Sequence, residues 1–403
     1  MDTARRPSPI SPRPPQNWRV WLIVSLALLL GIVVGLVVWR ALLTPIKTTV
    51  VVPTKSTERP TLTAETVLSG YDHIWDIAFL PSKEMIFTER KGAVHIVQNG
   101  NARKLIDIPD VLGQGEGGLL GVAVDPAFAE NHYIYTCFNS NKSGPRDVRL
   151  ARWSLNAELT SLGERKDIIT GMPAANSGRH SGCRAKFGPD GYLYVGTGDA
   201  AQGDAGIDHK NLGGKVLRID RDGNPAPGNL GGDFDPRIFS FGHRNVQGIA
   251  FFDTPQNGAI GITVEHGSTV DDEINLLVKG NFGWAPAASG YDETNVPMTD
   301  KTRYPDAIEA IWSSGSPTIA PSGATFLRGE QWKGWEGSLA MAVLKGKHLK
   351  IMTINDKNQI TSTEDLFSQQ FGRLRTAVQG PDGNLYISTD NGGDDQIIRV
   401  TPR

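Results

Sequence analysis

A glycine-flanked histidine in the middle of the sequence has the type and setting needed for proton transfer. His180 lies in the stretch Ser177-Gly-Arg-His-Ser-Gly182, directly before two short apolar runs separated by the turn Pro189-Asp-Gly191. An imidazole titrates near neutral pH, and a polar loop anchored by a β-hairpin is where a general base is expected. A hydrogen-bonded structural histidine or a surface histidine is the alternative interpretation of His180.

Further along the chain, cationic side chains recur in short polar stretches. Arg244 and Asn245 precede a predicted strand, and the pairs Lys345 with Lys347 and Arg373 with Arg375 are each two residues apart. Residues two apart project from the same face of a strand. Gathered at one place, these cations would bind the carboxylates or phosphates of a small polyanion. An ordinary solvated face is the alternative for each pair.

The acidic stretch from Val264 to Asn275 offers oxygen atoms to a hard cation. The donors would be the backbone carbonyls of Gly267 and Ser268, or the carboxylates at 271–273. Calcium prefers such oxygen ligands. A solvated acidic loop that binds no metal fits the same residues equally well.

A repeated pattern of strand pairs must position these residues. Six times the chain shows an apolar strand, a turn marked by Pro or Gly, and a second apolar strand. The successive copies are spaced at or above the roughly 40–50 residues of a four-stranded propeller blade. Equivalent points in the six copies are Phe79, Val124, Phe187, Phe251, Phe326 and Val378. We therefore predict an all-β fold, a six-bladed β-propeller over residues 63–403. Degenerate fourth and fifth copies leave five or seven blades as the alternative.

Composition narrows the class of protein. The 46 Gly and 25 Pro residues are dispersed among short apolar runs, which is typical of many strands and turns. A net charge of −2 argues against a nucleic-acid partner, because nucleic-acid-binding domains usually carry a basic excess. The two cysteines, Cys137 and Cys183, are too few for a disulfide framework. Free buried thiols are expected, with a bridge between them as the alternative.

The N-terminal segment predicts a membrane anchor. Residues 1–19 are rich in Pro and Arg and should form a disordered cytoplasmic tail. Residues 20–39 carry no charge and are long enough to cross a hydrocarbon core of about 30 Å as a helix. Residues 40–62 suit an extended tether. Arginines before the apolar stretch predict a signal anchor with the propeller on the extracytoplasmic side. A cleaved signal peptide is the alternative.

From about Gly70 to its end, the chain resembles the soluble glucose/sorbosone dehydrogenase family, the sugar dehydrogenases that use pyrroloquinoline quinone (PQQ). The family's landmarks occur in order: Gly115-Glu-Gly-Gly-Leu-Leu-Gly121 before Asp125-Pro126, the His180 loop, Gly242-His-Arg-Asn245, Glu265-His-Gly267 with Asp272-Glu-Ile-Asn275, Asn281-Phe-Gly-Trp284, and Gly372-Arg-Leu-Arg375 with Pro381-Asp-Gly383. The family fold is a six-bladed propeller, which agrees with the repeat.

The resemblance implies a PQQ-dependent aldose dehydrogenase, which the predicted N-terminal anchor would hold at the membrane. His180 would be the base that takes the proton from a sugar hydroxyl while hydride passes to the quinone. Arg244 would stabilise charge on the quinone oxygens, with Asn245 beside it. Asp76 would contact a sugar hydroxyl.

The resemblance also implies two cofactors. Lys345, Arg373 and Arg375 would bind the carboxylates of PQQ. The carbonyl oxygens of Gly267 and Ser268 would bind a calcium ion that polarises the quinone. The electron acceptor is a carrier that the sequence does not identify.

At two positions the chain departs from the family pattern. The family usually has proline where this chain has Ser268, and its glucose-oxidising members have an acidic residue where this chain has Arg179. The change at Ser268 predicts an altered calcium loop. Because of Arg179, glucose is not expected to be the substrate. Two other functions compete with the enzyme: a propeller that binds carbohydrate or protein without turnover, and a propeller lactonase or other calcium hydrolase.

Overall fold

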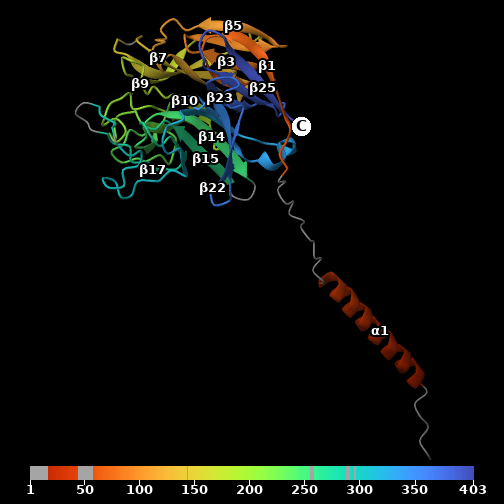
Figure 1. The fold of residues 1–403 in the computed structure, drawn as a ribbon. Helices are drawn as coiled ribbons and strands as arrows, with labels where there is room; N and C mark the ends of the chain where they lie inside the picture. Colours follow the sequence, from red (N-terminus) through yellow and green to blue (C-terminus); the bar gives the residue numbers. More distant parts are fainter. Residues whose placement is uncertain (1–16, 44–57, 143, 255–257, 287–290, 295) are drawn as a thin grey trace, which may run out of the picture. The chain divides into compact units, whose positions relative to one another are not determined.

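The structure is a computed structural model that describes residues 17–43, 58–142, 144–254, 258–286, 291–294 and 296–403 (Figure 1). It divides into two units, Met1–Thr54 and Lys55–Arg403. The first unit contains helix α1 (Trp18–Leu43). Residues 1–16 of the predicted tail and 44–57 of the predicted tether lie outside the described residues.

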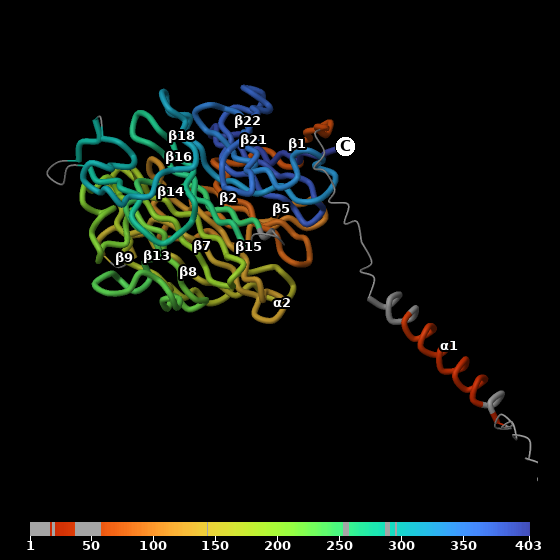
Figure 2. The backbone as a smooth tube through the Cα atoms, turned by 90° about the horizontal axis from the view of Figure 1, so that it is seen from below, coloured from red at the N-terminus to blue at the C-terminus, as the bar shows by residue number. Residues whose placement is uncertain are grey.

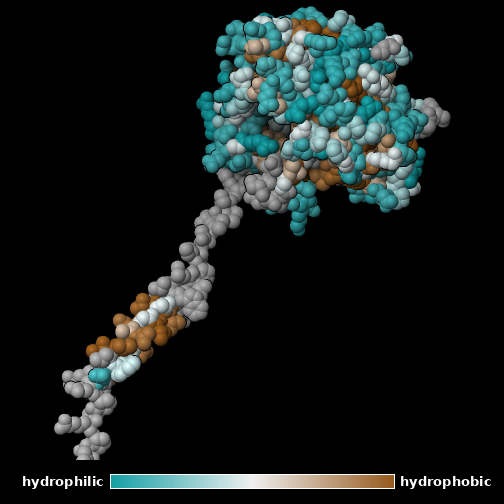
Figure 3. Space-filling view, turned by 180° about the vertical axis from the view of Figure 1, so that it is seen from behind, coloured by the Kyte–Doolittle hydropathy of each residue, from teal (hydrophilic) through white to brown (hydrophobic). Residues whose placement is uncertain are grey.

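Helix α1 coincides with the predicted anchor but begins earlier and ends later. Among the described residues, none of the helices has the length and hydrophobicity that a membrane span requires, so the predicted transmembrane segment at 20–39 is not confirmed. Large hydrophobic side chains that are exposed in the described residues all lie on α1, apart from Val278. In the space-filling view the coloured residues of α1 are mostly hydrophobic, whereas the face of the propeller that is visible is mostly hydrophilic (Figure 3).

The described strands of the second unit form six sheets, each a blade of a β-propeller. Blade 1 is β2 (Ile74–Phe79), β3 (Met85–Glu89), β4 (Ala93–Gln98) and β5 (Asn101–Asp107). Blade 2 is β6 (Leu119–Val124), β7 (Tyr133–Ser140), β8 (Asp147–Ser154) and β9 (Lys166–Pro173), with α2 (Phe128–Asn131) between β6 and β7. Blade 3 is β10 (Arg184–Phe187), β11 (Leu193–Gly196), β12 (Lys215–Ile219) and β13 (Ile238–Phe241), extended by β17 (Gly280–Asn281).

The remaining blades complete the circle. Blade 4 is β14 (Val246–Thr254), β15 (Gly258–Glu265), β16 (Glu273–Leu276) and β18 (Trp312–Ser313). Blade 5 is β19 (Pro321–Phe326), β20 (Leu339–Val343), β21 (His348–Ile354) and β22 (Ile360–Leu366), with the 3₁₀ helix η1 (Glu330–Trp335) between β19 and β20. Blade 6 is β23 (Leu374–Gln379), β24 (Leu385–Thr389), β25 (Asp395–Pro402) and β1 (Leu62–Tyr71).

The first strand of each blade lines the central channel. β2, β6, β10, β14, β19 and β23 contact one another in that order, and β23 returns to β2, so the ring is closed. All six equivalent points of the sequence repeat lie on these strands, which confirms the six-bladed prediction. The ring closes through β1, which pairs antiparallel with β25 in the register Leu62↔Pro402 (Figure 1). In Figure 2, β1 lies beside the C-terminus of the chain. The sequence patterns did not predict that β1, which precedes the first blade in the chain, completes the last blade.

The hydrophobic core lies between neighbouring blades. In one cluster Leu150 of β8 and Leu217 of β12 are fully buried between blades 2 and 3, and in another Ile351 of β21 and Ile387 of β24 are buried between blades 5 and 6. Burying one such side chain contributes roughly 1.5–3 kcal/mol. These contacts fix the strands rigidly, so the loops between them hold defined positions.

The prediction of free thiols was wrong. Cys137 on β7 and Cys183, directly before β10, form a disulfide with their Cα atoms 6.0 Å apart. The two cysteines belong to the same hydrophobic cluster between blades 2 and 3. Their separation along the chain gave no sign of this proximity, which arises from the packing of two blades. The bond ties the loop that carries His180 to the neighbouring blade.

Replacing both cysteines with alanine should lower the free energy of unfolding by about 2–4 kcal/mol, because the bridge no longer restricts the unfolded chain. Urea denaturation of the full chain, followed by tryptophan fluorescence, measures the change. Reduction of the unmodified chain should give a similar loss. An unchanged denaturation midpoint in both experiments would contradict a stabilising disulfide.

Candidate functional site

The loops that precede the channel-lining strands meet at one end of the channel. His180 lies before β10, Asn245 before β14 and Arg373 before β23. The ends of the same strands surround a cavity at the opposite end of the channel. Because the second strand of each blade runs back, the segments after those strands, including Asp199 and Asp390, also belong to the His180 end.

His180 is buried and held by an acidic partner. Its Nδ1 lies 2.7 Å from Oδ1 of Asp199, and the other carboxylate oxygen of Asp199 accepts a hydrogen bond of 2.8 Å from the indole of Trp284. A carboxylate at Nδ1 favours the tautomer in which Nδ1 carries the proton and Nε2 carries the lone pair. In the described part of the chain, Nε2 of His180 has no hydrogen-bond partner. Nε2 is therefore the basic atom.

The backbone around His180 requires glycine. A Cβ at Gly178, where φ is +76°, would lie 1.8 Å from the carbonyl oxygen of Gln114. This close approach brings Glu116 against the His180 loop, where its Oε2 accepts hydrogen bonds from the His180 amide and from Nδ2 of Asn245, both at 3.1 Å. In the sequence, Glu116 was noted only as part of the family motif Gly115–Gly121. Its role as the acceptor that fixes the His180 backbone was missed.

Asn245 is bonded on both sides of its amide. Its Oδ1 accepts hydrogen bonds of 3.1 Å from the Gly182 amide and from Nε2 of Gln247, and its Nδ2 donates to Glu116. Asn245 thus joins the loops of blades 2, 3 and 4. The contacts make it a residue that positions the His180 loop.

Arg244 is paired with an acidic residue that sequence analysis did not identify. Its Nε and Nη2 lie 3.0 and 2.6 Å from Oε2 of Glu293, and Nη1 donates to the His266 carbonyl at 3.0 Å. Nη2 of Arg179 lies 2.9 Å from the other oxygen of Glu293. Although burial lowers the pKa of Arg244, the negative partners outweigh that effect and raise it. Arg244 is therefore a permanent cation beside His180.

Tyr291 completes the wall around the histidine. Its hydroxyl lies 3.4 Å from Nδ1 of His180, 3.2 Å from Oδ2 of Asp199 and 3.0 Å from Oε2 of Glu293. Burial, followed by the charge of Asp199, raises the pKa of Tyr291, so the phenol remains protonated and donates its hydrogen bond. Tyr291 and Glu293 follow no repeat or motif, and the sequence held no signal for them.

Arg375 is buried and fully engaged. Nε lies 2.9 Å from Oδ2 of Asp390, Nη2 also contacts that carboxylate, and Nη1 donates to Oε1 of Gln247 at 3.1 Å. Burial opposes ionisation of Asp390, but Arg375 and a hydrogen bond from His73 outweigh it and hold the pKa of Asp390 well below its usual range. Arg375 is thus part of a buried ion pair as well as a candidate ligand-binding cation.

Arg373 has a different environment. Its Nε donates to the backbone carbonyl of Asp390 at 3.2 Å, and among the described residues its guanidinium has no ion pair. Burial lowers the pKa of Arg373; Asp390 opposes this effect, and the positive charges of Arg375 and Arg90 add to it. Arg90, Arg373 and Arg375 form an arginine cluster, of which only Arg375 has an ion pair in the described residues. Sequence analysis predicted Arg373 and Arg375 but missed Arg90, which follows β3.

Lys345 and Asp76 are not joined to this group. The turn between β20 and β21 places Lys345 at the His180 end, but its side chain is exposed and donates to Oγ1 of Thr318 at 3.1 Å. Asp76 is buried in the channel, where it pairs with Arg184 and accepts a hydrogen bond of 3.0 Å from the Val122 amide. The structure therefore gives Asp76 a role in holding blades together, and brings it into no contact with His180.

The acidic stretch at 264–275 contains no free carboxylate in the described contacts. Asp272 accepts hydrogen bonds from the amides of Gly267 at 2.9 Å and Ala320 at 2.9 Å, and Asp271 accepts one of 2.6 Å from Ser313 Oγ. The hydroxyl of Ser268 is buried without a partner in the described residues. Asp271 and Asp272 hold the loop in place through these hydrogen bonds. A cation here would therefore have to bind neutral oxygen atoms.

Glu273 should make stability depend on pH. Burial, followed by the charge of Glu265, raises its pKa to about 8. A carboxyl whose pKa is higher in the folded chain stabilises the fold fully below its unfolded pKa of 4.5, and that stability is lost as the pH rises through about 8. Glu273→Gln should therefore raise Tm at pH 9 and leave it nearly unchanged at pH 4.5. Calorimetry at the two pH values tests this, and an equal Tm difference at both would contradict it.

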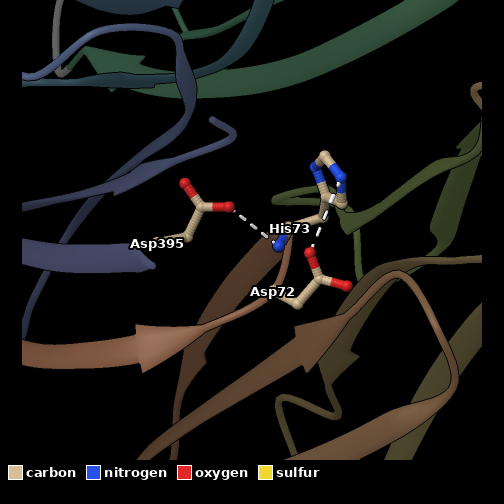
Figure 4. Close-up of side chains that lie close together, drawn as sticks. All are labelled: Asp72, His73 and Asp395. Carbon is tan, nitrogen blue, oxygen red and sulfur yellow. Dashed lines mark hydrogen bonds and ion pairs between the residues drawn. The ribbon is translucent and has the colours of Figure 1, made fainter. Parts of the chain in front are cut away.

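A second acidic group lies between blades 1 and 6. Asp72, His73 and Asp395 place possible ligand atoms within 4.8 Å of one another (Figure 4). The Asp395 carboxylate, however, accepts backbone hydrogen bonds of 2.8 Å from His73 and 2.9 Å from Gly392. The ring of His73 points to Asp390 through Nδ1. Because these atoms already serve hydrogen bonds, the group closes the joint between the first and last blades and is not a metal centre.

Comparison with known proteins places this site in context. The family described as Glucose / Sorbosone dehydrogenase matches residues 71–399. Aldose sugar dehydrogenase YliI of Escherichia coli is 30% identical over 85% of this chain and 94% of its own length, and quinoprotein glucose dehydrogenase B of Acinetobacter calcoaceticus is 28% identical over 82% and 86%. The PQQ-bound aldose sugar dehydrogenase of Streptomyces coelicolor superimposes with a TM-score of 0.70 at 29% identity, over 86% of this chain and all of that one.

Proposed function

The chain belongs to the glucose/sorbosone dehydrogenase family and is an oxidoreductase acting on CH–OH groups of sugars, and we propose that it is a PQQ-dependent aldose dehydrogenase in which His180 is the general base. The observation that carries the proposal is the position of the His180–Asp199 pair at the same end of the channel as the arginine cluster. One group removes a proton, and the other binds anions.

The residues present fit the cofactor. PQQ carries several carboxylates, and Arg373 and Arg90 are cations with no ion pair among the described residues. Forked guanidiniums match carboxylates in geometry and charge. Arg373 and Arg90 would hold the carboxylates, and Arg375, fixed by Asp390, would add charge behind them. When bound, PQQ supplies the two-electron acceptor that the side chains lack.

Side chains of the protein would accept the proton and stabilise the charges that form. Nε2 of His180 accepts the proton of the sugar hydroxyl as the C–H bond breaks. Asp199 stabilises the imidazolium that forms, since its carboxylate lies 2.7 Å from Nδ1. Arg244 is a fixed cation on the same side of the site and stabilises negative charge that develops on a neighbouring oxygen. Trp284 and Tyr291 restrict the access of water to Asp199.

Calcium is the second cofactor of the proposal, and the ligands that this chain would offer it are neutral. Gly267 and Ser268 offer neutral oxygens, including the unpartnered Ser268 hydroxyl, and no free carboxylate accompanies them among the described contacts. Neutral ligands bind Ca²⁺ weakly unless an anion completes the site. We therefore expect calcium to bind the chain well only together with PQQ, which titration of Ca²⁺ with and without the quinone would check. Strong binding of Ca²⁺ alone would contradict this ligand set.

Arg179 would influence the choice of sugar. It is exposed, lies next to His180 in sequence and pairs with Glu293, which also pairs with Arg244. A cation here differs from the acidic residue of glucose-oxidising relatives, so an aldose other than glucose is the expected substrate. A panel of aldoses compared by kcat/KM tests this expectation.

The decisive experiment is reconstitution. PQQ and Ca²⁺ are added to the purified full chain, the quinone spectrum is recorded, and reduction of an artificial dye is followed with each aldose, because the natural electron acceptor is unidentified. We expect the quinone absorbance to shift on binding and dye reduction to depend on sugar. Absence of quinone uptake and of dye reduction would overturn the proposed function and favour a non-catalytic propeller.

Membrane anchoring and an extracytoplasmic propeller are part of the proposal. They are supported by the uncharged stretch at 20–39, by the exposed apolar side chains of α1, and by the disulfide, since disulfides persist mainly in oxidising compartments. Protease added to spheroplasts should digest the propeller. Protection of the propeller there, with digestion only after lysis, would contradict this topology.

A further inference from the structure

The end of the channel opposite His180 holds a large cavity that the proposed reaction does not use. Its volume is about 760 Å³. Phenylalanines near the ends of four channel-lining strands contribute to its wall, and Val124 of β6 lies at the equivalent place in a fifth strand; the phenylalanines are Phe79, Phe187, Phe251 and Phe326. We call this cavity the apolar funnel.

One ammonium group lines the apolar funnel. Lys186 lies two residues after Arg184 on β10, so both side chains project into the channel. In the described part of the chain the Lys186 ammonium has neither a hydrogen bond nor an ion pair. Burial, helped by the charge of Arg184 and opposed by Asp76, lowers the pKa of Lys186. Lys186 is partly buried, and an anion in the apolar funnel would give its ammonium the partner that it lacks.

Charge along this part of the channel is unbalanced. Asp76 is the carboxylate that faces the two cations, and it is already paired with Arg184. Nη2 of Arg184 is buried and has no partner in the described residues. Asp125, at the wall of the apolar funnel, is paired with Arg221 and does not offset the charge. Arg328, an exposed residue that also lines the apolar funnel, adds a further cation without an ion pair in the described residues. Positive charge therefore exceeds negative charge among these groups.

We propose that the apolar funnel is a second binding site, separate from the sugar site, for a small monocarboxylate with an apolar body. The carboxylate would pair with the Lys186 ammonium, and the aliphatic or aromatic body would pack against the phenylalanines. A neutral apolar molecule would leave Lys186 unpaired. The inference does not depend on PQQ or on the oxidation of sugar.

Isothermal titration of the full chain with octanoate tests the site. Binding is expected for the unmodified chain and should weaken about tenfold or more in Lys186→Met, which keeps the length and apolar character of the side chain but removes the charge. Lys186→Arg should retain binding. The matched control is Lys357→Met, at an exposed turn, which should bind octanoate as the unmodified chain does. The melting temperature of each variant verifies that it is folded.

A neutral analogue separates an anion site from a merely apolar cavity. Octan-1-ol should bind the unmodified chain more weakly than octanoate and should be insensitive to Lys186→Met. The proposal is overturned by any one of three results: no octanoate binding at millimolar concentration, equal binding of octanoate and octan-1-ol, or octanoate binding that folded Lys186→Met leaves unchanged.

Discussion

Alanine in place of His180 is expected to lower kcat for sugar oxidation by roughly 10²–10⁴-fold and to leave PQQ affinity nearly unchanged. The reason is that different residues would accept the proton and bind the cofactor. Nε2 of His180 is the basic atom, whereas the cations that would hold the quinone are the arginines of the cluster. Steady-state kinetics at saturating PQQ measure kcat, and a quinone titration of the same preparation measures the affinity.

Two further measurements make the assignment specific. Added imidazole should restore part of the turnover of His180→Ala, because it can occupy the vacated space and accept the proton. His209→Ala is the matched control, since His209 pairs with Asp233 and stacks on Phe234 away from the channel, and it should keep its kcat. If His180→Ala retained most of its kcat, His180 would not be the base.

Arg373→Ala should weaken PQQ binding about 10- to 100-fold while changing the stability of the fold little. The guanidinium of Arg373 has no ion pair in the described residues, so its removal costs the protein few contacts and the ligand a charge-assisted hydrogen bond of roughly 1.5–3 kcal/mol. Quinone titration gives the affinity, and thermal denaturation gives Tm without PQQ.

Arg375→Ala should behave differently. It would leave the Asp390 carboxylate buried with only the hydrogen bond to His73, and breaking a buried pair in this way typically costs about 3–5 kcal/mol. Its Tm without PQQ should therefore fall, whereas that of Arg373→Ala should not. Equal Tm losses in the two variants would show that Arg373 is as structural as Arg375. Unaltered PQQ affinity in Arg373→Ala would remove it from the cofactor site.

Local patterns predicted much of this protein. The repeat gave six blades and the positions of their first strands, because alternating apolar residues and Pro or Gly turns act over a few residues. Ordered short motifs gave the family, and through it His180, Arg244 and Arg373. These features can be predicted from the sequence because each depends on residues that lie close together in the chain.

Other features follow from contacts between distant segments. Asp199 could be recognised as the partner of His180 only once β11 placed it opposite the loop, and Glu293 and Arg90 reach the site from segments with no motif. The pairing of β1 with β25 joins the two ends of the propeller. Cys137 meets Cys183 because two blades pack face to face.

The sequence by itself therefore determined the architecture and the family, and it predicted the type of chemistry at His180. The tertiary structure decided which charged side chains are available to a ligand. Arg375 and Asp76 each form a buried ion pair. Arg373 and Lys186 have no ion pair in the described residues. The physical reason is that a side chain's availability depends on the partners that folding brings within hydrogen-bond distance. Those partners come from other blades, and spacing along the chain does not report them.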